Sequence, residues 1–166
     1  RAGRDGLPAS AWMSYGLSDI AAQRNFIEES NAPDNQKRIE RQKLNSLLGL
    51  CEASSCRRQI LLDYFGEASK PCGNCDTCAN KPETFDASIA AQKAISCVYR
   101  TGQRFGVGYL IDVLSGTQDS RIQNFHHDQL SVFGIGKEFS KVEWQSIFRQ
   151  LVAINFLKVD IAGHGG

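Results

Sequence analysis

The middle of the chain reads Cys72-Gly73-Asn74-Cys75-Asp76-Thr77-Cys78, and a further cysteine, Cys56, lies sixteen positions before Cys72. The Gly, Asn and Asp residues between these thiols predict a tight knuckle rather than a helix or a strand. Ser54-Ser55-Cys56-Arg57-Arg58 resembles the capped start of an apolar helix. Zn²⁺ prefers four thiolates around one tetrahedral ion, and C-x2-C spacing lets neighbouring sulfurs bind the same ion. The spacing therefore predicts a structural zinc site with the ligands Cys56, Cys72, Cys75 and Cys78.

Two other uses of these cysteines remain as alternatives, an iron–sulfur cluster and disulfide bonds. A ferredoxin run adds a fourth cysteine followed by proline soon after the third. Here Ala79, Asn80 and Lys81 follow Cys78, and the fourth thiol comes from upstream, so zinc is favoured. Crowding of the thiols into one knuckle also favours a reducing compartment. Cys51 and Cys97 lie within apolar helical patterns, and we expect both to be core residues.

Composition allows one domain or two to three small ones. The 166 residues are 42% hydrophobic and 22% charged, so the chain can bury a core, and its net charge is +1. No apolar run reaches the ~18 residues of a transmembrane helix. The abrupt start, Arg1-Ala2-Gly3-Arg4-Asp5-Gly6, predicts a piece of a longer protein, and its two arginines suit phosphate contacts, with a solvated loop as the alternative.

Apolar periodicity predicts a mainly α fold with short strands. The expected strands are 10–15, read as buried, and 155–161, read as an edge strand that enters a glycine turn. The expected inward apolar residues include Phe26, Leu61, Tyr64, Phe65 and Val142. We expect helices over 18–29, 36–53, 56–65, 88–100, 109–114 and 140–152. The pattern predicts three domains: 1–33, 34–81 and 82–166.

Gly134-Ile135-Gly136-Lys137 invites a phosphate-loop interpretation, which the neighbouring residues exclude. A P-loop needs a glycine five residues before its Gly-Lys pair and Ser or Thr after it. Ser131 and Glu138 occupy those positions, so we expect this chain to be unable to hydrolyse ATP by itself.

Three signatures, in this order, resemble the RecQ DNA helicases over essentially the whole chain. Residues 1–6 look like the end of the last helicase motif, and the cysteine region looks like the zinc-binding subdomain. The third signature resembles the winged-helix (RQC) module and comprises Arg104-Phe105-Gly106-Val107-Gly108-Tyr109, Ser120-Arg121-Ile122, His127-Asp128, residues 130–137, Trp144 and Arg149-Gln150-Leu151. One departure is His126, because many relatives have glycine immediately before the His-Asp pair.

The resemblance implies an ATP-driven helicase that moves 3′ to 5′ and acts in replication, recombination and repair. Residues 1–33 would end a RecA-like α/β domain, and Arg1 and Arg4 would reach the γ-phosphate of ATP as arginine fingers. The cofactors implied are zinc, ATP and Mg²⁺. The partners implied are single-stranded and forked duplex DNA and a single-strand-binding protein, without a membrane. The resemblance favours a bacterial, cytoplasmic, nucleoid-associated protein over a nuclear one.

Several polar residues of the winged-helix region are candidates for DNA contact, each with a solvated loop residue as the alternative. Helix N-termini after Gly116 and Ser140 would present N–H groups to phosphates. The tip of the wing would place a ring against the terminal base pair. The candidates are Thr117, Arg121, His127, Lys137, Ser140, Lys141 and, at the wing, His164. A stand-alone zinc/winged-helix regulator and a zinc module that only docks proteins are the competing functions.

Overall fold

The computed structural model describes residues 9–11 and 13–159, and this part of the chain is helical, without strands. The mainly α fold is therefore confirmed. None of these helices combines the length and hydropathy that crossing a membrane requires. The elements are α1 (Leu17–Glu29), α2 (Asp34–Glu52), α3 (Arg57–Tyr64), α4 (Asp76–Ala79), α5 (Ser88–Arg100), α6 (Val107–Ser115), α7 (Ser120–Asn124), the 3₁₀ helix η1 (His127–Gln129) and α8 (Lys141–Ala153).

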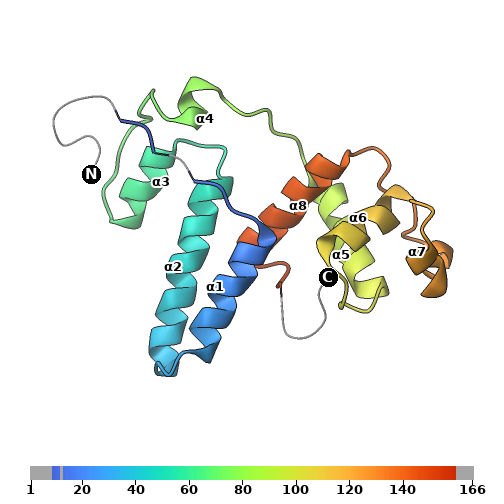
Figure 1. The fold of residues 1–166 in the computed structure, drawn as a ribbon. Coiled ribbons are helices and arrows are strands. Elements are labelled where there is room, and N and C mark those ends of the chain that lie inside the picture. The colour runs from blue at the N-terminus through green and yellow to red at the C-terminus, as the bar shows by residue number, and fades with distance from the viewer. Residues whose placement is uncertain (1–8, 12, 160–166) are drawn as a thin grey trace.

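The helices form two halves joined by α8 (Figure 1). In the first half, α1 and α2 make a long hairpin, and α3 and α4 lie near the upper end of α2. The second half contains α5, α6, α7 and η1, and α8 extends from it to the hairpin. Ile20, Leu48, Val152 and Ala153 form a small apolar cluster where α8 meets the hairpin. The C-terminal helix therefore belongs to both halves.

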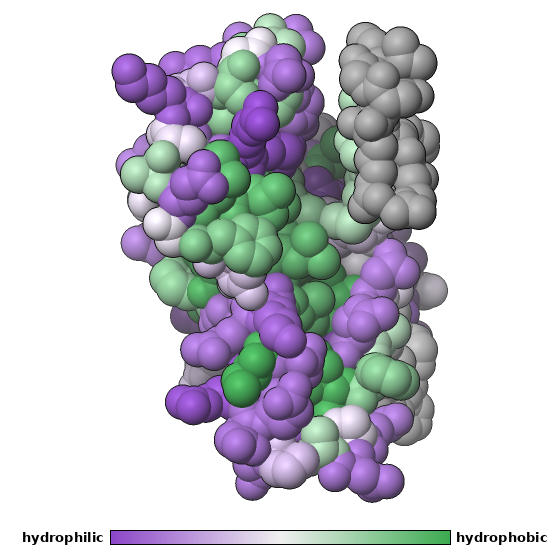
Figure 2. Space-filling model, turned by 90° about the vertical axis from the view of Figure 1, so that its left-hand side faces the viewer, coloured by the Kyte–Doolittle hydropathy of each residue, from purple (hydrophilic) through white to green (hydrophobic). Residues whose placement is uncertain are grey.

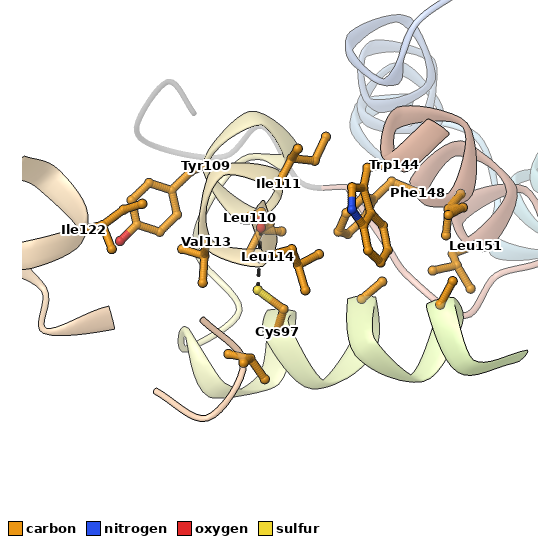
Figure 3. Packing of buried hydrophobic residues seen from close by; sticks show 14 residues of the cluster. Cys97, Tyr109, Leu110, Ile111, Val113, Leu114, Ile122, Trp144, Phe148 and Leu151 are labelled. Atoms are coloured by element: carbon orange, nitrogen blue, oxygen red, sulfur yellow. Dashed lines mark hydrogen bonds between the residues drawn. The ribbon is translucent and has the colours of Figure 1, made fainter. Parts of the chain in front are cut away.

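The second half has a closely packed core around α6 and α8 (Figure 3). Trp144 and Phe148 are fully buried, and Trp144 Nε1 donates a hydrogen bond to the carbonyl of Gly136 at 2.8 Å. A Cβ on Gly136 would lie 2.6 Å from the indole, so the close approach requires glycine. Cys97 is also fully buried, and its thiol points to the carbonyl of Leu110 at 3.7 Å, which confirms its predicted core position.

The first half buries much less. Ile20, Ala21 and Leu48 are its buried aliphatic residues, and α3 has no buried residue. Figure 2, seen from the side where α2 and α3 lie, shows apolar side chains gathered in the middle of this face.

The inward placement predicted for five side chains is wrong, because no described element covers them. These residues and their exposed fractions are Phe26 75%, Leu61 47%, Tyr64 52%, Phe65 73% and Val142 73%.

Neither predicted strand forms in the described residues. The segment 10–15 is not buried as predicted, since Met13 is 54% exposed and no described strand lies beside the segment. The strand predicted from alternating apolar and polar residues after Asn155 does not form in the described part. Asn155 has a left-handed backbone (φ 63°), and residues 156–159 form a bend and an irregular segment. Residues 160 and 161 lie outside the described part of the chain.

Short helices were the elements that periodicity missed. Within the cysteine knuckle, Asp76–Ala79 forms α4, so the knuckle contains a helical turn. The helices α7 and η1, which follow Gly116, were likewise not among the predicted helices. Asp119 caps α7, since its side chain accepts from the backbone N–H of Arg121. The helix predicted over 18–29 begins one residue earlier, at Leu17. Its N-cap is Gly16, whose N–H donates to the Asp19 carboxylate at 2.7 Å.

Candidate functional site

The four predicted zinc ligands lie together. Their sulfurs are all within 4.8 Å of one another, and the Sγ atoms of Cys56 and Cys75 are 4.0 Å apart. Tetrahedral Zn²⁺ with Zn–S bonds of about 2.3 Å places sulfurs about 3.8 Å apart, so this set fits a structural zinc ion. Cys56 and Cys75 are the N-caps of α3 and α4, and Gly73 turns the chain between them with φ 72°.

Backbone N–H groups point to these sulfurs, and the Thr77 hydroxyl lies beside one of them. The N–H of Cys72 points to Cys56 Sγ and the N–H of Cys75 to Cys72 Sγ, both at 3.3 Å, and the former lowers the pKa of Cys56. The hydroxyl of Thr77 lies 3.3 Å from Cys75 Sγ and lowers the pKa of Cys75 to about 5. The N–H of Gly73 lowers the pKa of Cys78, but the neighbouring Cys75 thiol and desolvation outweigh it and raise that pKa to about 11. Four thiolates this close need a cation, so metal binding would release protons.

A salt bridge links the two helices that begin at ligands. Arg57 makes a bidentate pair with Asp76, with Nε–Oδ1 2.6 Å and Nη2–Oδ2 2.8 Å. The same guanidinium donates to the carbonyl of Leu50 at 2.5 Å. It therefore supplies a donor to one of the last carbonyls of α2, which have no partner within the helix. Arg57 follows Cys56 and Asp76 follows Cys75, so this pair fixes two ligands relative to α2. The sequence predicts only a helix start near Arg57. The signal for the pair is that Arg57 follows one cysteine ligand and Asp76 follows another.

Cys51 and Cys97 do not belong to the four-cysteine group. Burial raises the pKa of both thiols, that of Cys97 to about 12. Cys51 is only half-buried, at the end of α2, so it is less of a core residue than predicted.

Four of the DNA candidates gather near the C-terminal end of α6. The N–H of Thr117 donates to the carbonyl of Asp112 at 2.9 Å, and Lys141 Nζ lies 3.8 Å from the Asp112 carboxylate. The side chain of Lys137 passes over Gly116, where a Cβ would lie 3.0 Å from Lys137 Cε. Ser140 is the N-cap of α8, next to Lys141. All four side chains are exposed, and their contact with DNA stays a prediction.

The helix N-termini expected to offer free N–H groups are partly occupied. Asp119 Oδ1 accepts from Arg121 N at 2.7 Å. In α8, Ser140 Oγ accepts from Glu143 N at 3.3 Å, while the Glu143 carboxylate accepts from Ser140 N at 2.7 Å. These carboxylates also add negative charge, so phosphate contacts at both helices would depend mainly on side chains.

Arg121 and His127 lie apart from that group, beside the start of α6. His127 is only 8% exposed, and its Nδ1 is 2.6 Å from the hydroxyl of Tyr109. Burial, with the charge of Arg104, lowers the pKa of His127. The buried ring supports the module from inside, and a direct DNA contact by His127 stays a prediction. Arg121 is exposed above the Tyr109 ring at 5.1 Å.

His126 adopts the backbone conformation that glycine would adopt freely, with φ 56° and ψ 26°. Histidine in place of the expected glycine therefore leaves a left-handed turn in place, at some cost in backbone strain. Arg1, Arg4 and His164 lie outside the described residues.

Comparison with known proteins matches two family models. Residues 17–79 match the RecQ zinc-binding model, and residues 81–166 match the RQC domain. The domain boundaries predicted from the sequence, between residues 33 and 34 and between residues 81 and 82, stay a prediction.

Individual relatives agree with these families. An ATP-dependent DNA helicase RecQ of Pasteurella multocida is 48% identical over 160 residues, and its counterpart in Haemophilus influenzae is 44% identical; each alignment covers 95% of this chain. The ATP-dependent helicase SGS1 of Saccharomyces cerevisiae is 32% identical over 95% of the chain, which corresponds to 12% of that protein. The chain spans 25% and 26% of the two bacterial relatives.

Proposed function

Since this chain belongs to the RecQ family and carries its zinc-binding and RQC domains, we propose that it is the C-terminal segment of an ATP-dependent 3′–5′ DNA helicase. The observation that carries the proposal is the family match on both sides of residue 80, together with a four-thiol cluster inside the zinc-binding part. In this role the segment binds duplex and forked DNA during replication, recombination and repair.

Cys56, Cys72, Cys75 and Cys78 would hold the zinc ion in this proposal. The ion supplies folding free energy and no redox chemistry, since Zn²⁺ has a filled d shell. The chain's own residues do the positioning: Arg57 and Asp76 fix the two helix starts, and backbone N–H groups of the knuckle point to the sulfurs. The zinc-binding half would in turn place the RQC half through the contact between α2 and α8.

ATP and Mg²⁺ would bind elsewhere in the full-length protein, because Ser131 and Glu138 exclude a P-loop at residues 134–137. The segment alone is therefore proposed to be inactive as an ATPase. Arg1 and Arg4 are proposed to act as arginine fingers and His164 as a weak wedge at the wing, while Thr117, Lys137, Ser140 and Lys141 contact phosphates. A single-strand-binding protein is a proposed partner, and the bacterial nucleoid, in the cytoplasm, is the proposed location.

The test uses the zinc-loaded 166-residue chain and the full-length protein side by side. The segment should bind a forked duplex at low salt and release no phosphate from ATP, whereas the full-length protein should unwind the same fork. A zinc-loaded, folded segment that ignores forked DNA, or a full-length protein that binds the fork without hydrolysing ATP, would contradict the proposal.

A further inference from the structure

One carboxylate joins three parts of the chain that lie far apart in sequence. Glu52, at the end of α2, accepts two hydrogen bonds on the same oxygen, Oε1, from the hydroxyl of Tyr15 and from Nε of Arg149, the latter at 3.2 Å. Tyr15 precedes α1, and Arg149 belongs to α8, so the contact links the zinc-binding half to the RQC half. We call these three residues the hub.

The hub is largely shielded from water. The side chain of Glu52 is 14% exposed and that of Arg149 is 32% exposed, and Tyr15 packs against the apolar cluster where α8 meets the hairpin. A partly buried ion pair is screened by salt less than a surface pair. Desolvation, followed by the hydrogen bond to Glu52, raises the pKa of Tyr15, so the phenol stays protonated and remains a donor.

The hub fixes the direction of α8, which the neighbouring apolar contacts cannot do alone. Val152 and Ala153 lie three and four positions after Arg149, on one face of α8, and they form an apolar cluster with Ile20 and Leu48. Apolar contact is non-directional, so it tolerates small rotations of one helix on another. Hydrogen bonds restrict such rotations, because they weaken steeply when donor and acceptor are misaligned.

A second polar contact lies at the C-terminal end of α8. Nη2 of Arg24, from α1, donates to the carbonyl of Val152 at 3.4 Å and to Oδ1 of Asn155 at 3.3 Å. Both distances are long for hydrogen bonds, and Nη1 of Arg24 is buried without a partner in the described part of the chain. The hub, which contains a charge-assisted pair, is therefore the main polar contact that sets the angle of α8.

The helix α8 carries any change at the hub to the rest of the RQC half. Another face of α8 buries Trp144, Phe148 and Leu151 in the core of that half, so the half turns together with the helix (Figure 3). The first residue of α8, Lys141, is a proposed phosphate contact. About 12 Å of helix separate Lys141 from Arg149, so a tilt of about 10° at the hub moves the first turn by about 2 Å. Such a shift is enough to break a hydrogen bond to a phosphate.

We propose that Tyr15, Glu52 and Arg149 are positioning residues that couple the grip of the RQC half on DNA to the ATP-driven step of the full-length helicase. The proposal rests on the proposed function. Tyr15 lies eleven positions after Arg4, a proposed arginine finger, so the hub ties the segment that follows the proposed ATP site to α8. A loosened hub would let ATP be hydrolysed without separation of the strands, because the RQC half would no longer follow the motor.

The experiment uses the full-length, zinc-loaded protein and compares fork binding, ATP hydrolysis on single-stranded DNA, and base pairs unwound per ATP hydrolysed. Glu52→Gln keeps an acceptor of the same shape and removes the charge. It should lower the base pairs unwound per ATP by about three- to tenfold, while fork binding and ATP hydrolysis stay within about twofold of the parent. Arg149→Gln should do the same. The double variant should be no worse than either single one, since both changes remove one interaction.

Three further variants test the mechanism. Arg149→Lys keeps a positively charged donor, and it should retain most of the coupling because Arg149 contacts Glu52 through a single nitrogen. Tyr15→Phe removes only one hydroxyl and should cause a smaller loss in the same quantity, so it decides the question if a charge variant fails to fold. The matched control is Glu138→Gln, which removes an ion pair with Lys93 inside the RQC half and should keep the parent coupling.

The outcomes separate two failures. A parent protein that neither binds nor unwinds the fork contradicts the proposed function itself. If the parent unwinds and both Glu52→Gln and Arg149→Gln unwind as many base pairs per ATP, the hub does not couple the two halves. A purely structural role predicts that fork binding, ATP hydrolysis and unwinding all fall together, and this result, or an equal effect of Glu138→Gln, would also overturn the proposal. Zinc content and circular dichroism of each variant verify that the fold is kept.

Discussion

The two halves of this chain are held together by different means. The α5–α8 half buries fourteen side chains in one cluster, including an indole and a phenyl ring with no exposed surface. The α1–α4 half buries few aliphatic side chains, leaves α3 without a buried residue and exposes Phe26 and Phe65. In place of a core it has four clustered thiols and the Arg57–Asp76 pair. A segment too small to bury a core can use a metal cross-link as its main source of stability.

Removal of the metal is expected to have the largest effect on the difference in stability between the two halves. Cys75→Ser should lose tightly bound zinc and with it folding free energy on the order of 10 kcal/mol, the scale of structural zinc sites. Elemental analysis should give one zinc ion per parent chain, and limited proteolysis of the variant should cut the α1–α4 half first. Cys51→Ser is the matched control and should keep its zinc. A Cys75→Ser protein with full zinc content and parent-like protease resistance would remove Cys75 from the ligand set.

The second test compares one phenylalanine from each half. Phe148 is fully buried and Phe26 is 75% exposed. Phe148→Ala should cost about 3–5 kcal/mol, through lost burial and the cavity left behind. Phe26→Ala should change stability by no more than about 0.5 kcal/mol. Chemical denaturation of the zinc-loaded chains measures both values, and similar costs for the two variants would contradict the distinction drawn between the halves.

The third test addresses the junction between the two halves, where the end of α2 meets α8. Glu52 at the end of α2 accepts hydrogen bonds from Tyr15 and from Arg149 of α8, and its side chain is only 14% exposed. Desolvation, followed by the hydrogen bond to Glu52, raises the pKa of Tyr15. Glu52→Ala leaves a phenol and a guanidinium without their acceptor, so we expect a cost of about 1–3 kcal/mol. Calorimetry should then resolve separate melting of the two halves.

The control for the junction is Glu40→Ala. Glu40 lies on the same helix and pairs with Lys43, but its side chain is 40% exposed, so its loss should cost less than about 1 kcal/mol. Equal effects of the two substitutions would show that the junction contributes no special coupling between the halves.

The sequence predicted most of the long helices and the four thiols, for a common physical reason. Apolar periodicity and C-x2-C spacing are local patterns, and the range expected for α5, 88–100, agrees with the structure. The start of α8 after Ser140 was likewise visible as a local signal, whereas the capping-box partner Glu143 was not predicted. These features depend on residues a few positions apart, so they need no knowledge of the fold.

The remaining features depend on what lies beside each element. Tyr64 and Phe65 have the spacing of an inward stripe, but no described element lies against them. The strand predicted at 155–161 needs a pairing partner, which periodicity cannot supply. The Arg57–Asp76 pair and the contact of Arg104 with the Phe125 ring join residues far apart in sequence. Contacts of this kind are set by the tertiary arrangement.

The smallest effect is expected in the turn between α7 and η1, at His126. His126 is exposed and has φ 56°, a conformation that costs an L-residue about 1–2 kcal/mol and glycine almost nothing. Glycine also gives the unfolded chain more freedom, which offsets part of this gain. His126→Gly should therefore stabilise the zinc-loaded chain by about 0.5–1 kcal/mol, measured as a rise in the denaturation midpoint.

Two further substitutions, one at Gln123 and one at His126, test whether backbone strain is the cause of that stabilisation. Gln123→Gly, inside α7, should destabilise by about 0.5–1 kcal/mol because glycine is unfavourable in a helix interior. His126→Ala keeps a Cβ and should keep most of the strain. If His126→Gly lowers the midpoint as Gln123→Gly does, the histidine ring stabilises the turn through contacts that outweigh the backbone cost. The strain explanation for position 126 would then be wrong, and glycine would not be the more stable choice in this chain.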